Sequence, residues 1–541
     1  MSTAASQEQH EEYRVRGWWP GGRLEQHYLR HVESEPGALA VADSTGRELT
    51  RVELWQRSGE LADVLESKGI GSGDIVLLFL PNRLEWQIAM LAVLRRRAVP
   101  ASIPTSTDAK TLTYAAKLVG CRFVLTSESE KGQGLLDLAE SAAADLERGL
   151  QILCIAADGG FQLCGEEELV DDVSGVNLEL DHIMFTSSTT GLPKAVMHTA
   201  DTLAALNILF AERFSLGPDT PIFMGSPLGH SVGGIHGARL ALYTGAALIL
   251  QETWQPHLAL QMIDQYQCKF TAAATPFLKD LVDEQRNRKN HGKRMLATFL
   301  CGGAPVPPAL LETAWNEFPD TFFTNLWGMT EGGLVTSVPD SPKEKLIGTA
   351  GIGLPGLELR ILDDDENARD SNCIGELAMR GPGVFVGYYG QDDLYQSLLT
   401  ADGFFRTGDL ARIDNDGYVQ ITGRLKDIIV RGGVNISPLP AEDVLSSHPK
   451  IRSVAIVGYP DDRLGERICA VIEATDETPT LDELIDFATG EGLPKRQLPE
   501  VIRYIDAMPR TAAGKIRKPI LKDLIERAGA EQLHMELNDG N

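Results

Sequence analysis

Apolar runs and helix-spaced stretches alternate along the first third of the chain. The apolar runs have the composition of strands and lie at residues 75–80, 123–126 and 152–155. The stretches beside them have helical periodicity and lie at residues 84–97, 109–119 and 135–147. This alternation predicts crossover units, in which helices connect the strands of a largely parallel sheet.

The middle of the chain, residues 183–356, combines apolar runs with clusters of Gly, Ser, Thr and Pro. Each cluster is embedded between apolar segments, which is typical of functional loops held on a packed scaffold and less so of linkers. Candidate chemistry is therefore expected in this part of the chain.

Strand-like segments dominate after Gly351. They occupy residues 357–362, 375–379, 418–421, 428–430, 452–458 and 467–474. The last two flank a turn predicted at residues 459–462, and helices are predicted at residues 441–447 and 481–489. The end of the chain thus predicts a small α+β domain of about 115 residues, an ordinary domain size. We expect one domain at residues 1–425 and another at residues 426–541.

The composition is that of an ordinary globular protein, with 43% hydrophobic and 23% charged residues over 541 positions. Lys plus Arg number 50 and Asp plus Glu number 76, so the formal net charge is −26. Such an acidic surface repels nucleic acid and anionic membranes. An anionic ligand must therefore meet a local cluster of basic groups or backbone N–H donors.

Cysteine usage and the N-terminal pattern favour a reducing cytoplasm. The seven cysteines are scattered and form no C-x-x-C pair, which argues against a disulfide framework and a zinc site. The first thirty residues lack a basic segment followed by an apolar stretch, so no secretion signal is expected. No run of about eighteen mainly apolar residues occurs, so no transmembrane segment is expected.

Three short patterns point to other kinds of site. Residues 351–356 fit G-x-G-x-x-G, but a strand-like segment follows where a dinucleotide-binding motif would open a helix. Residues 229–233 fit the nucleophile elbow G-x-S-x-G, with Ser231 as nucleophile and a partner among His257, His291 and His448. Pro227 interrupts the strand that would deliver this serine, which counts against a nucleophile elbow. A serine hydrolase is nevertheless kept as the alternative from another class of protein. His230 and His236 could bind a metal, although two isolated histidines lie more often in ordinary packing.

A hydroxyl-rich segment follows the apolar run at residues 183–185. Its sequence is Thr186-Ser187-Ser188-Thr189-Thr190-Gly191-Leu192-Pro193-Lys194-Ala195. Such a segment makes a poor helix or core strand, but it supplies donors and a cation for a polyphosphate. It is not a Walker A loop, which requires G-x-x-x-x-G-K-[ST].

This segment resembles the phosphate loop of the adenylate-forming superfamily, which contains acyl- and aryl-CoA synthetases, nonribosomal peptide synthetase adenylation domains and luciferases. The family pattern is T-S-G-[ST]-T-G-x-P-K-G, so Ser188 and Ala195 stand where the family has Gly. Further segments resemble family motifs in the family's order, and together they span about residues 186–518. They are Cys301-Gly302-Gly303-Ala304-Pro305, Leu326-Trp327-Gly328-Met329-Thr330-Glu331, Arg406-Thr407-Gly408-Asp409-Leu410, Gly423-Arg424-Leu425-Lys426-Asp427 and Pro509-Arg510-Thr511-Ala512-Ala513-Gly514-Lys515.

The resemblance implies ATP, Mg²⁺ and CoA as ligands and gives single residues a role. The hydroxyl-rich loop and Lys194 would take the β- and γ-phosphates of ATP, and Lys515 would bridge the incoming carboxylate and the α-phosphate. Thr330 would contact the α-phosphate, and Glu331 would hold Mg²⁺. The residues expected around adenine and ribose are Gly302, Gly303, Ala304, Pro305, Trp327, which replaces the family's usual Tyr, Gly328, Asp409 and Arg424.

The resemblance also implies a fold and a second half-reaction. The fold is a large N-terminal α/β domain with a smaller, mobile C-terminal α+β domain, which swings about Lys426. Gly432, Gly433 and Asn435 would then line the pantetheine tunnel for CoA. Pro440 replaces the first Glu of the motif that follows this tunnel.

The segment Ser226-Pro227-Leu228-Gly229-His230 is similar to CoA ligases for medium-chain and alicyclic acids, with His230 near the substrate carboxylate. Val232 and Leu334 would form an apolar wall, and no Lys or Arg nearby could pair a second carboxylate. We therefore expect activation of a small or medium monocarboxylic acid to its acyl-adenylate and transfer to CoA. A stand-alone enzyme that loads a carrier-protein thiol remains an alternative, and a monomer or homodimer is expected.

Overall fold

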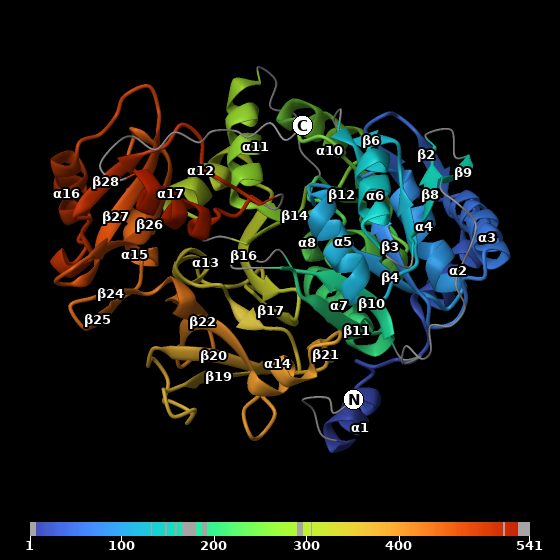
Figure 1. Cartoon of the computed structure of the whole chain (residues 1–541), viewed down its shortest axis with the longest axis horizontal. Coiled ribbons are helices and arrows are strands. Elements are labelled where there is room, and N and C mark those ends of the chain that lie inside the picture. The colour runs from blue at the N-terminus through green and yellow to red at the C-terminus, as the bar shows by residue number, and fades with distance from the viewer. Residues whose placement is uncertain are drawn as a thin grey trace.

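The computed structural model describes residues 7–130, 133–146, 149–156, 160–164, 180–186, 192–288, 296–303, 306–511 and 514–528. Within them the chain forms a large N-terminal α/β part and a smaller C-terminal α+β part, which lies at the left of Figure 1 in orange and red. The predicted fold class is confirmed. The boundary between residues 425 and 426 remains a prediction, and a short 3₁₀ turn, Leu425–Asp427, lies there.

The predicted crossover units form the centre of a first sheet. In spatial order the described strands are β21 (Gly387–Tyr388), β11 (Ala195–Thr199), β10 (Leu180–Phe185), β4 (Val99–Ser102), β3 (Ile75–Phe79), β5 (Phe123–Thr126), β8 (Gln151–Ile155) and β9 (Phe161–Cys164). The strands from β10 to β8 are parallel, and every residue in them is buried, as expected for apolar strands covered on both faces. The outer pairs are antiparallel.

A second sheet, which the pattern did not separate from the first, also has a parallel centre. In spatial order its described strands are β18 (Ile352–Gly353), β17 (Gly332–Thr336), β16 (Phe322–Met329), β15 (Thr298–Gly302), β14 (Phe270–Ala274), β12 (Ile222–Met224), β13 (Leu248–Leu250), β1 (Leu39–Asp43) and β2 (Glu48–Thr50). The run from β16 to β1 is parallel, and the pairs outside it are antiparallel.

Helix α4 (Leu84–Arg95) lies between the two sheets. Residues 84–94 of this helix are all buried, and α4 contacts β3 and β4 of the first sheet and β1 of the second. A mainly apolar helix has to be covered on most of its surface, so its position follows from its composition. The core around α4 contains residues of both sheets, for example Leu78 and Leu250.

The remaining helices of the large part cover the sheets or connect their strands. They are α1 (Gln7–Val15), α2 (Leu24–Ser34), α3 (Arg51–Ser67), α5 (Ala109–Leu118), α6 (Leu135–Ala144), α7 (Ala200–Phe214), α8 (Ser231–Gly233), α9 (Leu240–Thr244), α10 (Pro256–Gln265), α11 (Thr275–Asn287), α12 (Pro308–Glu317), α13 (Lys343–Gly348) and α14 (Asp392–Ser397). A π-helical turn, Gly234–Arg239, joins α8 to α9.

An antiparallel sheet follows the second parallel one. Its order is β19 (Glu358–Leu362), β20 (Gly375–Arg380), β22 (Phe405–Ile413) and β23 (Val419–Arg424). Residues 351–356, which fit the dinucleotide pattern, lead from β18 to β19 and open no helix. The expected mismatch with a dinucleotide-binding motif is thus confirmed. A small hairpin, β6 (Ser129–Glu130) with β7 (Gln133–Gly134), lies outside the larger sheets.

The C-terminal part has a sheet with helices beside it. Its strands are β25 (Val434–Ile436), β24 (Ile429–Arg431), β27 (Gly465–Ala474), β26 (Ile451–Asp461) and β28 (Val501–Tyr504), which pairs with β27. Its helices are α15 (Leu439–Leu445), α16 (Leu481–Gly490) and α17 (Lys518–Ala528). The predicted turn at residues 459–462 is wrong for residues 459–461, which extend β26 and pair with β27. Pro460 is tolerated there because β26 is an edge strand.

Candidate active site

The candidate phosphate loop connects β10 to β11. Its two ends are joined by hydrogen bonds: the Thr186 N–H donates to the Lys194 carbonyl at 3.0 Å, and the Lys194 N–H donates to Thr186 Oγ1 at 3.2 Å. Ser187, Ser188, Thr189, Thr190 and Gly191 lie outside the described residues. The Lys194 ammonium lies 4.7 Å from the centre of the Tyr388 ring, so the ring faces a cation at the end of this loop.

Glu331 and Thr330 are held by two residues that sequence analysis missed. Both site residues are buried in the turn between β16 and β17. The Tyr388 hydroxyl donates to Glu331 Oε1 at 2.8 Å, and His198 Nε2 donates to the Thr330 carbonyl at 2.8 Å. No motif marks His198, and the only signal at Tyr388 is an aromatic residue between Gly387 and Gly390.

Burial raises the pKa of the Glu331 carboxyl, and the Tyr388 hydrogen bond and the charges of Lys194 and Lys515 oppose that rise. Glu331 is thus a carboxylate in a low-dielectric position, and cations reach it from both parts of the chain. A further cation bound beside such a buried carboxylate would strongly stabilise its ionised form.

Trp327, Asp409 and Arg424 form one connected group. The Trp327 indole N–H donates to Asp409 Oδ2 at 2.8 Å, and Arg424 Nε lies 2.8 Å from Asp409 Oδ1. Trp327 and Asp409 are almost fully buried, whereas Arg424 keeps 43% of its side chain exposed. Three separate motifs therefore meet, as expected for residues around one nucleotide.

Lys515 reaches this group from the C-terminal part. It belongs to a tight turn in which the Thr511 N–H donates to the Lys515 carbonyl at 2.8 Å and the Arg510 guanidinium donates to the Gly514 carbonyl at 2.8 Å. A Cβ on Gly303 would lie 3.2 Å from Lys515 Cε, and one on Gly514 would lie 3.7 Å from Ala274 Cβ. The turn thus packs on the ends of β14 and β15.

The pKa of the Lys515 ammonium is lowered to about 8, mainly by removal from water. The charges of Arg424 and Lys426 contribute to this lowering, and the charges of Asp409 and Glu331 oppose it. The charges of Lys515, Glu331 and Asp409 therefore act on one another.

His230 faces the same region from the second sheet. It is half-buried, and its Nδ1 is shielded from solvent without a hydrogen-bond partner among the described residues. Desolvation, and then the charge of Lys515, lower the pKa of the imidazole to about 4. His230 is therefore neutral near pH 7, and its ring can donate one hydrogen bond and accept another without adding a charge.

The hydrolase arrangement does not form among the described residues. Ser231 begins α8 after a loop and does not follow a strand directly, and no described histidine is hydrogen-bonded to its hydroxyl. His448 lies in the C-terminal part against Phe487, and His291 lies outside the described residues. His236 stacks on Phe210 at 4.9 Å, and the described residues contain no group of three potential metal ligands.

The other predicted residues that the structure describes lie either in β15 and β16 or in the C-terminal part. Gly302 ends β15 beside Leu326, and Gly328 in β16 lies against Leu334, whereas Ala304 and Pro305 lie outside the described residues. The predicted CoA residues Gly432, Gly433 and Asn435 lie in the exposed hairpin of β24 and β25. The structure thus brings Lys515, and not this hairpin, to the candidate nucleotide site.

Lys515 gives the site a pH dependence. The ammonium is the form that would bind the phosphate and carboxylate, and it is lost as pH rises through about 8. We expect adenylation kcat/KM to fall above that pH, with Lys515→Arg moving the fall to higher pH because guanidinium stays protonated. A pH profile of acid-dependent exchange of pyrophosphate into ATP measures this, and a flat profile to pH 10 would contradict the assignment.

Gly303→Ala should slow adenylation about tenfold or more, because its Cβ would lie 3.2 Å from Lys515 Cε and displace the ammonium. Alanine at φ +87° also strains the backbone by about 1–3 kcal/mol, which lowers the melting temperature. Gly417 is a matched control, since it has φ +83° and open space around its Cβ position. Gly417→Ala should lower the melting temperature similarly while the exchange rate holds. Equal exchange rates in the two variants would show that the Lys515 contact is unimportant.

Family models and a solved structure identify the class of protein. Residues 29–389 match the family model "AMP-binding enzyme", and residues 441–515 match "AMP-binding enzyme C-terminal domain". ATP-bound MatB from Rhodopseudomonas palustris has the same fold, with a TM-score of 0.81 at 24% identity over 94% of this chain and 100% of that one.

Full-length relatives agree with this class. The medium-chain fatty-acid–CoA ligase of Escherichia coli is 32% identical over 527 residues, which is 95% of this chain and 93% of the relative. The human mitochondrial medium-chain acyl-CoA ligase ACSF2 is 28% identical over 91% of this chain and 85% of its own length. The chain belongs to the AMP-binding enzyme family, and the predicted adenylate-forming resemblance is confirmed. Among the described residues, no helix has both the length and the apolar character needed to span a membrane.

Proposed function

We propose that this protein is an AMP-forming acid–thiol ligase that activates a small or medium monocarboxylic acid and transfers the acyl group to CoA. The observation that carries the proposal is the position of Lys515, which lies against Gly303 and is within electrostatic reach of Glu331 and Asp409. The names of the E. coli and human relatives support CoA as acceptor.

In the first half-reaction a carboxylate oxygen attacks the α-phosphorus of ATP, and pyrophosphate leaves. Lys515 neutralises charge that gathers between the carboxylate and the α-phosphate, which is the most effective place for a fixed cation. Lys194 and the loop that it ends hold the outer phosphates. Trp327 packs on adenine, while Asp409, oriented by the indole N–H and Arg424, accepts the ribose hydroxyls.

Glu331 suits Mg²⁺ that arrives with ATP. Mg²⁺ is commonly bound through one or two carboxylates and substrate phosphates, and not by an all-protein cage. One buried carboxylate with a raised pKa, and no group of three potential ligands among the described residues, fit that mode. When bound, the ion would offset phosphate charge. The Tyr388 hydrogen bond would hold the Glu331 carboxylate in one orientation for this role.

The second half-reaction needs a different face of the C-terminal part. Rotation about Lys426 would withdraw Lys515 and bring the hairpin of Gly432, Gly433 and Asn435 to the adenylate. The CoA thiol would then attack the acyl carbonyl and release AMP. The 3₁₀ turn Leu425–Asp427 and the exposed position of the hairpin support this arrangement.

We expect kcat/KM to rise from short to medium or alicyclic monoacids, because each buried CH₂ contributes about 0.8 kcal/mol until the pocket is full. Diacids and α-amino acids should be poor substrates, since His230 is neutral and their second charge would be buried unpaired. A panel that includes hexanoate, cyclohexanecarboxylate, a dicarboxylate and an α-amino acid measures this. Preference for either of the last two would refute the pocket assignment and leave the adenylation chemistry standing.

The experiment that tests the function is acid-dependent exchange of labelled pyrophosphate into ATP by the purified protein. A ligase exchanges label only with acid present, and the exchange survives Ser231→Ala. A serine hydrolase would show none and would cleave esters without ATP. Adding CoA or a carrier protein to the best acid then identifies the acceptor: thioester formed only on the carrier would favour the alternative function.

The seven free cysteines support a reducing cytoplasm as the location.

A further inference from the structure

Asn82 connects the two sheets at the segment that carries His230. It lies between β3 and α4 and is only 5% exposed. Its Nδ2 donates to the Ser226 carbonyl at 2.8 Å, with a longer contact of 3.4 Å to the Gln251 carbonyl, and its Oδ1 accepts from the Leu228 N–H at 2.8 Å. One amide thus satisfies backbone groups in the loops that follow β12 and β13.

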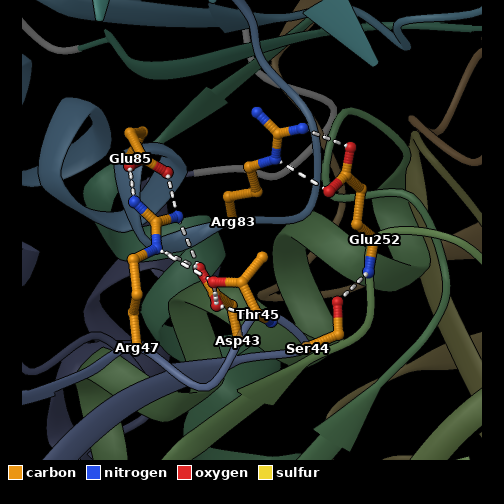
Figure 2. A network of polar contacts seen from close by, with 7 residues as sticks. All are labelled: Asp43, Ser44, Thr45, Arg47, Arg83, Glu85 and Glu252. Atoms are coloured by element: carbon orange, nitrogen blue, oxygen red, sulfur yellow. Dashed lines mark hydrogen bonds and ion pairs between the residues drawn. The ribbon is translucent and has the colours of Figure 1, made fainter. Parts of the chain in front are cut away.

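The residues beside Asn82 strengthen the same connection. Arg83 forms a two-point ion pair with Glu252, with Nε–Oε2 at 2.8 Å and Nη2–Oε1 at 2.7 Å, which Figure 2 marks with two dashed lines. The Glu252 N–H donates to Ser44 Oγ at 3.4 Å. Figure 2 also shows Arg47 between Asp43 and Glu85, which holds the turn after β1 to the start of α4. These ion pairs join the turn after β1 to α4, whereas Asn82 bonds to the loop that carries His230.

The segment from Ser226 to Gly233 is closely packed at its glycines. A Cβ on Gly229 would lie 2.5 Å from the Ile103 carbonyl oxygen, and one on Gly233 would lie 2.3 Å from the Pro227 carbonyl oxygen. The His230 N–H donates back to the Pro227 carbonyl at 3.0 Å. A displacement of Leu228 must therefore be passed on to His230, two residues away.

We propose that Asn82 is a positioning residue for the acid half of the reaction: it holds Leu228, and through it His230, in the place that receives the substrate carboxylate. An amide is needed because it presents one acceptor and one donor edge to a backbone N–H and a backbone carbonyl at once. The proposal rests on the proposed function, which gives His230 its place beside the acid.

Asn82→Ala should raise the KM for the acid about tenfold or more in pyrophosphate exchange and leave the KM for ATP nearly unchanged, because small displacements at a binding group cost large factors. Asn82→Asp, which keeps an acceptor for Leu228 but turns a second acceptor toward the Ser226 carbonyl, should give the same split. Arg47→Gln is the matched control from the same network: it should lower the melting temperature without changing either KM.

A double-variant cycle with His230→Ala separates positioning from a general loss of stability. If Asn82 acts through His230, adding Asn82→Ala or Asn82→Asp to His230→Ala should cost no further acid kcat/KM. Losses that multiply, or a KM for ATP that rises as much as that for the acid, would overturn the proposal. Absence of acid-dependent exchange in the unmodified protein would instead refute the proposed function.

Discussion

Lys515→Ala slows acyl-adenylate formation by about 10²–10³-fold or more, the loss expected when a fixed charge at the reacting phosphate is removed. Thioester formation from supplied acyl-adenylate and CoA should stay close to the unmodified rate, because the proposed function gives the lysine a role in the first half-reaction only. The fold should not suffer, since the position lowers the pKa of this ammonium and so disfavours its charged form. Pyrophosphate exchange and thioester formation, measured separately, give the two rates.

Lys522→Ala is the control for Lys515→Ala. Lys522 lies on α17 of the same C-terminal part and pairs with Glu466 at 3.7 Å. Its replacement should leave both rates unchanged. Comparable loss of both half-reactions in Lys515→Ala would contradict the assignment of this lysine to adenylation.

Lys426→Pro should produce the opposite split. Proline fixes φ near the value found in a 3₁₀ turn, so the turn Leu425–Asp427 and the present position of Lys515 should largely survive. Other hinge conformations are lost at residue 426. Proline also disfavours the helical backbone of Leu425, which precedes it, so a small loss of adenylation should accompany the larger loss of CoA transfer. We expect adenylation to persist and CoA transfer to fall about 10²-fold, because the tunnel hairpin no longer reaches the adenylate.

Lys426→Ala separates the hinge from the side chain, since it removes the charge and keeps φ free. It should leave CoA transfer much closer to the unmodified rate than Lys426→Pro does. If CoA transfer survived Lys426→Pro while adenylation failed, the pivot would have to lie elsewhere in the chain.

The hydrophobic pattern of the sequence predicted the strands in which every residue is buried. The strand at residues 123–126 is confirmed without change as β5, and residues 75–80 are confirmed as β3 but for one residue. Helix ends were less predictable: α4 ends at Arg95 and not at residue 97, because Arg97 takes a left-handed φ of 58°. The sequence gives no sign of this conformation at position 97, because arginine rarely adopts it.

The motifs supplied the identities of the site residues but not their partners. Trp327 and Asp409 lie in different motifs 82 positions apart, in β16 and β22, and the indole N–H meets the carboxylate only because the two sheets of these strands pack together at the candidate site. Tyr388 reaches Glu331 because β21 pairs with β11 across a long sequence separation. Contacts of this kind depend on tertiary pairing, which short-range periodicity does not encode.

The central claim is that one chain joins a carboxylic acid to CoA through an acyl-adenylate. The most direct measurement is the product balance when purified protein is incubated with a medium-chain acid, ATP and CoA. We predict one AMP, one pyrophosphate and one acyl-CoA for each ATP consumed, with acyl-adenylate accumulating when CoA is withheld. Formation of ADP and phosphate, or of acyl-CoA without AMP, would contradict the claim.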